Sequence, residues 1–259
     1  MTRESHSQPD WSIVIPAYNE EDRLPPYLAA IQDFFATTPW SVEVIVADDG
    51  SVDRTASLVE QLADRWPALK IHSLPHNQGK GAAVRQGILR ARGKRILFAD
   101  ADGATPISEL HRLSKALDEG ADIAIGSRAV SDSETHVETS WRRRVIGRTF
   151  HAMVSIVGVR KIRDTQCGFK AFRAEVALPL FDTLTIDGFG FDVEVILLAQ
   201  RADLRIAEVP VNWTHVDGSR ISIFRDSPRM AMDVVSVRVK MLGGRYKAWP
   251  PHELKRGPI

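Results

Sequence analysis

Strand-like and helix-like segments alternate along the first half of the chain, and this alternation limits the folds that the chain can adopt. The strand-like runs cover residues 12–16, 42–47, 70–74, 95–99 and 121–126. The segments between them carry apolar residues at helical spacing. Such alternation, with short links, is typical of a parallel sheet covered by helices on both faces. The sequence therefore predicts an α/β fold of this kind with right-handed crossovers.

Composition narrows the class of protein further. With 259 residues and a formal net charge of +1, the chain is long enough for one large core and is not charged enough to attract nucleic acid in bulk. Cys167 is the only cysteine, so an intrachain disulfide is excluded. Residues 1–10 are polar, and we find neither a signal peptide nor an apolar run of about 18 residues that would cross a membrane.

The run 95–99 ends abruptly in two carboxylates, Asp100 and Asp102. We expect Thr105 to cap a new helix there, with Pro106 in its first position. Side chains that follow parallel strands lie at the carboxyl edge of the sheet, where open α/β proteins bind ligands. Because Mg²⁺ takes one or two carboxylates and fills its other positions with phosphate and water, this pair predicts a metal–diphosphate site. A solvated acidic turn is the alternative.

Polar loops also follow Ile15 and Ala47, and they should leave the same edge of the sheet. Tyr18, Glu20 and Asp49 offer donors and acceptors for a nucleotide base and ribose, and Asn19 is expected to cap the next helix. The Gly-Lys-Gly sequence at 79–81 lacks the spacing of a phosphate-binding P-loop, so it is either a ligand loop or only a tight helix start.

The second half is less regular. We expect a helix from Trp141 with three arginines in its first turn, strands at 166–173 and 205–213, and a helix at 192–200 behind the glycine-rich turn 187–190. A last helix should start at Ser227 and end near Leu242. The expected organisation is a flexible N-terminus at 1–10, a catalytic domain at 11–226 and a C-terminal amphipathic helix and tail at 227–259.

Several motifs together resemble a known family. They are residues 15–20 (IPAYNE), 48–51 (DDGS), 77–81 (NQGKG), 100–105 (DADGAT), 126–129 (GSRA), 162–170 (IRDTQCGFK), 191–194 (FDVE) and 211–214 (VNWT). The chain resembles the inverting GT-A glycosyltransferases of family 2, and within them the dolichyl-phosphate β-glucosyltransferases and their bacterial polyprenyl-phosphate relatives. The resemblance spans roughly residues 12–242.

The resemblance implies roles for particular residues. It implies that the nucleotide sugar is bound by Pro16, Ala17, Tyr18, Glu20, Asp49, Lys80, Asp100 and Ala101. It implies a DXD metal motif of Asp100 and Asp102, with Mg²⁺ or Mn²⁺ as the cofactor. It implies that Arg128 and one or more of Arg142, Arg143 and Arg144 hold the acceptor phosphate, and that Arg220 lies near the donor diphosphate. The catalytic candidates are thus Asp102, Arg128, Arg220 and Asp192.

The resemblance also implies a reaction, with a hexose, most simply glucose, moving from a UDP-sugar to polyprenyl phosphate. A phosphate acceptor is already an anion and needs little help from a base, whereas a hydroxyl acceptor would require one, and Asp192 is then the candidate. The other hypotheses are a non-catalytic nucleotide-sugar-binding or scaffold protein and, less favoured, a nucleotidyltransferase.

A lipid-linked acceptor would bring the protein to a membrane. The helices from Trp141 and from Ser227 combine apolar stripes with basic flanks, a pattern found in helices that lie in the membrane interface. We therefore expect a cytoplasmic protein that is peripheral on the inner face of the membrane. The alternative is that both apolar stripes pack on the sheet. For the last helix, self-association is a further hypothesis.

Overall fold

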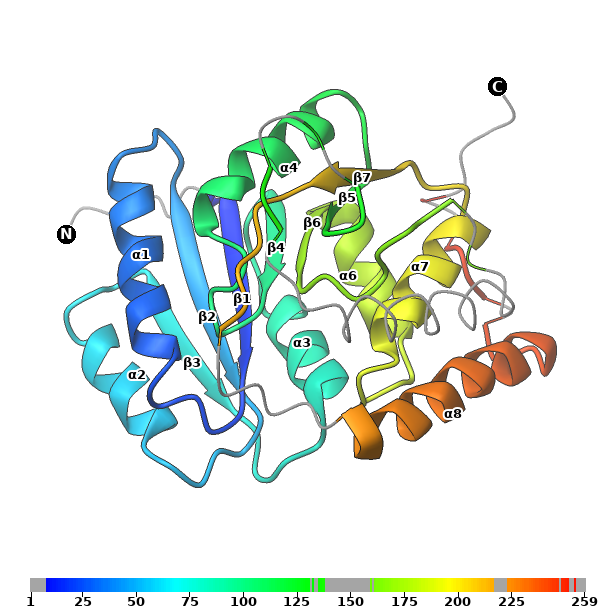
Figure 1. The fold of residues 1–259 in the computed structure, drawn as a ribbon, viewed down its shortest axis with the longest axis horizontal. Helices are drawn as coiled ribbons and strands as arrows, with labels where there is room; N and C mark the ends of the chain where they lie inside the picture. Colours follow the sequence, from blue (N-terminus) through cyan, green and yellow to red (C-terminus); the bar gives the residue numbers. More distant parts are fainter. Residues whose placement is uncertain are drawn as a thin grey trace, which may run out of the picture.

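The fold is built around one seven-stranded sheet with the strand order β3-β2-β1-β4-β6-β5-β7 (Figure 1). The computed structural model describes residues 8–130, 132, 135–137, 159, 161–216, 223–246, 248–251 and 254, and only the backbone of 223–231. The strands are β1 (Trp11–Ala17), β2 (Val42–Asp48), β3 (Leu69–Ser73), β4 (Arg95–Ala99), β5 (Ile123–Ser127), β6 (Phe169–Arg173) and β7 (Ile206–Pro210). All five strand-like runs of the first half thus match strands to within two residues at each end.

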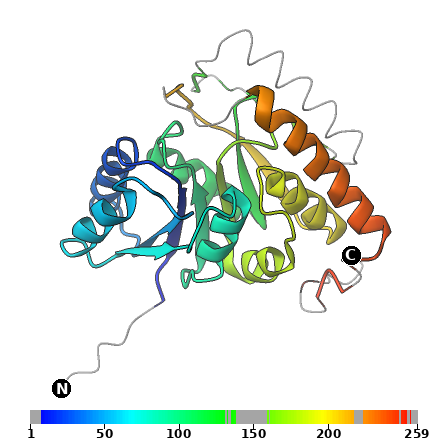
Figure 2. The same cartoon turned by 90° about the horizontal axis from the view of Figure 1, so that it is seen from below.

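Helices cover both faces of this sheet (Figure 2). The helices are α1 (Leu24–Ala36), α2 (Thr55–Ala63), α3 (Lys80–Ile88), the 3₁₀ turn η1 (Ile107–Glu109), α4 (Leu110–Asp118), α6 (Ala174–Thr183), α7 (Phe191–Arg201) and α8 (Ile223–Leu242). Alternate side chains of each strand point to opposite faces. Accordingly Ile13 and Ile15 join the core beneath α1 and α4, whereas Val14 joins the core shared by α3, α6, α7 and α8.

The sheet is mostly parallel, as expected for the GT-A fold class, but one strand runs the other way. β6 pairs antiparallel with both β4 and β5 and separates these two strands, which are neighbours in the sequence. β7 then pairs parallel with β5. The local sequence pattern does not encode this order, because an apolar strand has the same appearance in either direction.

Several local predictions were wrong. Asn19 does not cap α1, which begins at Leu24; it adopts a left-handed conformation with a φ of 55° and accepts hydrogen bonds from the next loop. Thr105 makes no helix cap either, because Pro106 has an extended backbone and a 3₁₀ turn precedes α4. The last helix starts at Ile223 rather than Ser227.

Helix α6 was not predicted, and the helix expected from Trp141 lies outside the described residues. Pro179 sits inside α6, and proline in a sequence argues against a helix because it removes one backbone bond. None of the described helices is sufficiently long and apolar to cross a membrane.

Candidate functional site

Polar loops from three parallel strands meet at one edge of the sheet, as predicted. β1 lies between β2 and β4, so the loops that follow these strands are adjacent. The backbone N–H of Asn19 donates to Ser51 Oγ at 2.9 Å, and the N–H of Val52 donates to Asn19 Oδ1 at 2.9 Å. The N–H of Glu20 donates to Thr55 Oγ1 at 2.8 Å. The first two loops are therefore tied into one rigid rim.

The residues expected to bind a nucleotide line this rim. Pro16 and Ala17 end β1, and Tyr18 is 37% exposed immediately beyond them. The Glu20 carboxylate accepts two hydrogen bonds from Arg23, at 2.7 and 2.5 Å. Tyr18 therefore offers an open aromatic surface at the rim, while Glu20 is held in place by a charged partner.

Asp49 ties the second loop to the third. Its two carboxylate oxygens accept hydrogen bonds from the backbone N–H groups of Gln78 and Gly79 at 2.7 and 2.9 Å. Burial raises the pKa of this carboxyl in spite of these bonds. Asp49 thus fixes the chain that enters α3, and a nucleotide would meet only its remaining lone pairs.

The acidic loop after β4 faces a lysine from α3. Lys80 Nζ lies 2.7 Å from Asp100 Oδ1, and its side chain is only 19% exposed. Burial works to lower the pKa of Lys80, but the carboxylates of Asp100, Asp192 and Asp102 raise it overall. Lys80 is therefore a firmly protonated cation at the expected position of a donor diphosphate.

The two carboxylates of this loop fit a hard divalent cation. Burial and the neighbouring Asp100 raise the pKa of Asp102, although Arg23, 3.9 Å away, and Lys80 act to lower it. Within the described ranges, no group of three or more acidic, histidine or cysteine side chains could hold a metal. An ion here would complete its coordination with ligand and water oxygens, as Mg²⁺ does at phosphate sites.

Gly168 makes room for this arrangement. A Cβ at this position would lie 2.0 Å from Asp100 Oδ2, and the Gly168 carbonyl accepts the Asp100 N–H at 2.8 Å. Any larger residue would displace the carboxylate. The 162–170 motif therefore contributes to the acidic loop through Gly168, which packs directly against Asp100.

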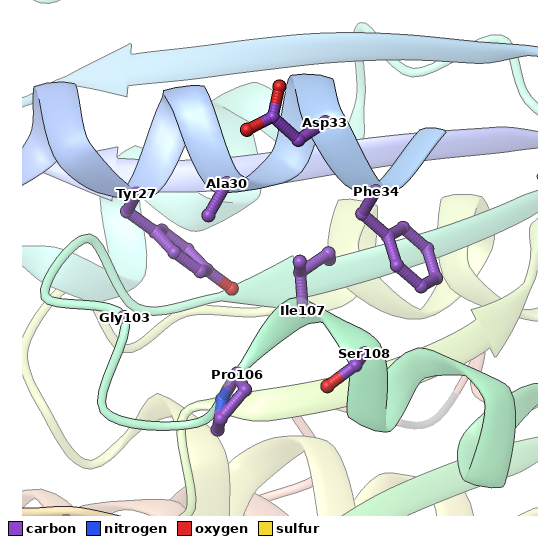
Figure 3. A pocket seen from close by; sticks show the side chains of 8 residues that line it. All are labelled: Tyr27, Ala30, Asp33, Phe34, Gly103, Pro106, Ile107 and Ser108. Atoms are coloured by element: carbon purple, nitrogen blue, oxygen red, sulfur yellow. The ribbon is translucent and has the colours of Figure 1, made fainter. Parts of the chain in front are cut away.

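An open groove of about 570 Å³ runs between α1 and the acidic loop (Figure 3). Tyr27 packs against Gly103 at this groove, where a Cβ on Gly103 would lie 2.9 Å from the tyrosine ring. The Tyr27 hydroxyl is buried and has no hydrogen-bond partner among the described residues. Burial, Asp100 and Asp102 together raise its pKa strongly, so it stays a neutral donor beside the acidic loop.

Asp192 lies beneath the loop rather than in the open site. It is 3% exposed, and its Oδ1 accepts a hydrogen bond from Lys170 Nζ at 2.5 Å. Lys170 is 1% exposed and also donates to the Cys167 carbonyl at 2.7 Å. Burial raises the pKa of Asp192 even though both lysines nearby act to lower it. Asp192 is thus half of a buried ion pair.

Arg128 is also engaged by an acid. Its Nε and Nη2 donate to the two oxygens of Asp164 at 2.7 and 2.9 Å, and its guanidinium lies 5.5 Å from the Trp213 ring centroid. Although burial opposes it, Arg128 lowers the pKa of Asp164 to about 2. Because one edge of the guanidinium is filled by Asp164, an acceptor phosphate would have to bind through Nη1.

The remaining predicted residues divide into two groups. Ala101 is buried within the acidic loop. Arg142, Arg143, Arg144 and Arg220 lie outside the described residues, so their roles stay predictions.

Lys170, Gly168 and Tyr27 were not among the predicted site residues. A signal existed for Lys170, which stands between the apolar residues Phe169 and Ala171 in β6. A lysine is fully buried almost only when it is paired. Tyr27 reads as an ordinary core residue of α1, and its contact with the acidic loop depends on the tertiary fold.

Comparison with known proteins places the chain in a family. Residues 12–181 match the model of glycosyl transferase family 2. The chain is 41% identical over 248 residues to the dolichyl-phosphate β-glucosyltransferase of Dictyostelium discoideum, covering 91% of this chain and 76% of that one. The chain is 37% identical to the Homo sapiens enzyme over 249 residues, covering 91% of this chain and 77% of that one. It is 39% identical to the Saccharomyces cerevisiae enzyme over 256 residues, covering 91% of this chain and 76% of that one.

Solved structures share the fold at lower identity. The glucosyl-3-phosphoglycerate synthase of Mycobacterium tuberculosis, in complex with Mn²⁺, UDP and glucosyl-3-phosphoglycerate, gives a TM-score of 0.65 at 20% identity, covering 91% of this chain and 80% of that one. The mannosyl-3-phosphoglycerate synthase of Rubrobacter xylanophilus gives a TM-score of 0.66 at 18% identity, covering 96% of this chain and 78% of that one. The match over residues 12–181 and the 41% identity to the Dictyostelium discoideum enzyme establish that the chain belongs to glycosyl transferase family 2, alongside the dolichyl-phosphate β-glucosyltransferases.

Proposed function

We propose that the protein transfers glucose from UDP-glucose to dolichyl or another polyprenyl phosphate, with inversion at the anomeric carbon and a divalent cation at Asp100 and Asp102. The names of the similar proteins support the sugar and the acceptor, and the Mn²⁺ and UDP of a structural neighbour support the donor and the metal. Mg²⁺ or Mn²⁺ would suit the two carboxylates equally well.

The burial of Asp192 is the observation that carries this proposal. A hydroxyl acceptor needs a base at the reacting carbon, and Asp192 was the candidate. Its carboxylate is instead 3% exposed and paired with Lys170, so it is poorly placed to take a proton from an acceptor in the open site. A phosphate acceptor, already ionised, removes the need for that base.

The reaction is then a single in-line displacement. A phosphate oxygen of the acceptor attacks the anomeric carbon, a new C–O bond forms, and the bond to the UDP oxygen breaks as that oxygen takes the electron pair. Lys80 is placed to stabilise the charge that builds on the diphosphate. Asp100 and Asp102 would hold the divalent cation, which would supply Lewis-acid stabilisation of the same charge. Arg128 and the arginines at 142–144 and 220 are the proposed phosphate contacts.

The test is transfer of radiolabelled glucose in detergent to undecaprenyl or dolichyl phosphate, with Mg²⁺, with Mn²⁺ and with EDTA. Parallel reactions use UDP-N-acetylgalactosamine and GDP-mannose as donors, and 3-phosphoglycerate, which carries a free hydroxyl beside its phosphate, as a soluble acceptor. We expect metal-dependent label from UDP-glucose in the organic phase and none in the EDTA reaction. Label only on 3-phosphoglycerate, or only from another donor, would overturn the proposal.

A lipid acceptor also requires contact with a membrane, and α8 has a surface suited to it. Met232, Val235, Val239 and Leu242 are exposed and fall within an arc of about 80° on the helix. Val234 and Val237 are fully buried on the other side. The exposed stripe is flanked by Arg238 and Arg245, which are exposed too. We propose that this stripe rests on an anionic lipid surface, to which each basic residue contributes about 1 kcal/mol.

Vesicle flotation tests this surface. We expect the protein to float with vesicles that contain a third of anionic lipid, and the double variant Val235→Gln/Val239→Gln to lose most of that binding. Glutamine is a better helix former than valine, so α8 should persist. Leu62→Gln, at a partly exposed apolar position of α2, is the matched control and should float normally. Equal flotation of the double variant would overturn the lipid contact. A shift to monomers in its sedimentation profile would assign the stripe to self-association.

A further inference from the structure

The turn at residues 187–190 joins the loop after α6 to α7 and lies directly against α8. The N–H of Gly190 donates to Asp233 Oδ2 at 3.3 Å. A Cβ on Gly190 would lie 2.3 Å from the Asp233 Cβ, and a Cβ on Gly188 would lie 2.8 Å from its Oδ2. Both glycines are therefore needed for the close approach of this turn to Asp233.

The opposite side of the same turn packs on the start of α3. The Ala82 N–H donates to the Asp187 carbonyl at 3.2 Å, and Arg85 forms an ion pair with the Asp187 carboxylate at 2.7 Å. A Cβ on Gly79 would lie 2.4 Å from the Asp187 carbonyl oxygen. The turn is thus held between α8 on one side and the first turn of α3 on the other.

Lys80 belongs to that first turn. Its ammonium lies 5.9 Å from the centroid of the Phe189 ring, which the 187–190 turn carries, and 2.7 Å from Asp100 Oδ1. Contacts therefore run without a gap from Asp233 through the turn to Lys80 and the acidic loop.

Helix α8 is itself firmly anchored, so it can act as a support. The buried carboxylate of Glu194 in α7 accepts hydrogen bonds from Tyr246 and Thr185, and Lys240 of α8 donates to Thr185 Oγ1 at 2.9 Å. Trp249 Nε1 donates to the Leu198 carbonyl at 2.7 Å. The segment that follows α8 thus folds back onto α7 and holds the helix in place.

Asp233 lies at the N-terminus of α7. Gly190 is the N-cap residue of the eleven-residue helix α7, so the carboxylate lies where the partial positive charge of a helix N-terminus is strongest. Lys240 attracts the carboxylate and Asp187 repels it, while burial raises its pKa. The hydrogen bond that its carboxylate accepts from the Gly190 N–H is what ties Asp233 to the turn.

We propose that Asp233 is a positioning residue for Lys80: by fixing the 187–190 turn it holds the start of α3 so that Lys80 meets Asp100 and the donor diphosphate. The identity of the ligand rests on the proposed function, whereas the positioning itself does not. The same helix carries the exposed apolar stripe, so the support of Lys80 and the proposed lipid contact lie on two faces of α8.

The test compares Asp233→Ala, Asp233→Asn and the control Asp182→Ala, a change of the same type at an exposed position of α6. The first readout is amide hydrogen exchange of residues 79–84 and 186–190 in the free protein. The second is the affinity for UDP in the presence of Mn²⁺, measured by calorimetry. We expect Asp233→Ala to speed exchange in both segments and to weaken UDP binding about tenfold. Asp233→Asn, which keeps an acceptor, should recover most of that loss, and Asp182→Ala should match the unaltered protein.

A double-mutant cycle shows whether Asp233 acts through Lys80. In the Lys80→Ala background, Asp233→Ala should change UDP affinity less than twofold, because the residue that it positions is gone. Additive effects, or unchanged exchange at 79–84 in Asp233→Ala, would overturn the proposal. Normal UDP affinity of Lys80→Ala alone would instead refute the proposed donor site, and hydrogen exchange would still decide the positioning role.

Discussion

Asp102→Asn should lower the rate of glucose transfer about a thousandfold while the protein stays folded. The change removes one of two carboxylates that suit a divalent ion, and loss of the several kcal/mol that such an ion contributes to the leaving group corresponds to this factor. The measurement is kcat as a function of Mn²⁺ concentration, together with calorimetric titration of UDP and Mn²⁺.

The stability of this variant should move in the opposite direction to its activity. The pKa of Asp102 is raised in the fold, so ionised Asp102 lowers the stability of the metal-free protein at neutral pH, and an uncharged side chain removes that cost. We expect an equal or higher melting temperature, which separates lost chemistry from unfolding. Asp182→Asn, the same change at an exposed position of α6, is the control. Activity within tenfold of normal, with an unchanged metal response, would contradict the assignment.

Lys170→Met should destabilise the protein by about 3–5 kcal/mol, because it leaves the Asp192 carboxylate buried without its partner. Removal of both charges in Lys170→Met/Asp192→Leu should restore most of the loss, since apolar pairs often replace buried ion pairs at little cost. Chemical denaturation at pH 7 measures the three free energies of unfolding. A single variant as stable as the parent would show that the pair is not held as the structure places it.

The same pair decides between the two acceptor classes. If Asp192 only holds the acidic loop from beneath, folded Asp192→Asn should still transfer glucose to polyprenyl phosphate at a measurable rate. Complete loss of transfer in a folded Asp192→Asn protein with normal UDP binding would indicate that Asp192 acts as a base and would favour a hydroxyl acceptor.

The edge of the sheet that carries the site was predictable from the sequence. The buried Lys170–Asp192 pair beneath the acidic loop was not. Asp100 and Asp102 follow directly on an apolar strand, a pattern that sequence alone reveals. Lys170 and Asp192 are separated by 22 residues and meet only because β6 enters the sheet beside β4. Asn19 likewise had the residue type of a helix cap, but its hydrogen bonds go to the next loop, which is distant in sequence.

The interior position of β6 bears on the order in which the chain can fold as it leaves the ribosome. β1 to β4 can pair as soon as they are made, since each finds a neighbour among the strands already synthesised. β5 cannot, because both of its neighbours, β6 and β7, come later in the chain. Nascent chains that end shortly after Ser127 would therefore expose β4 as an open edge and β5 as an unpaired apolar segment. The chaperone requirement of this protein should be greatest during synthesis of the roughly 40 residues before β6.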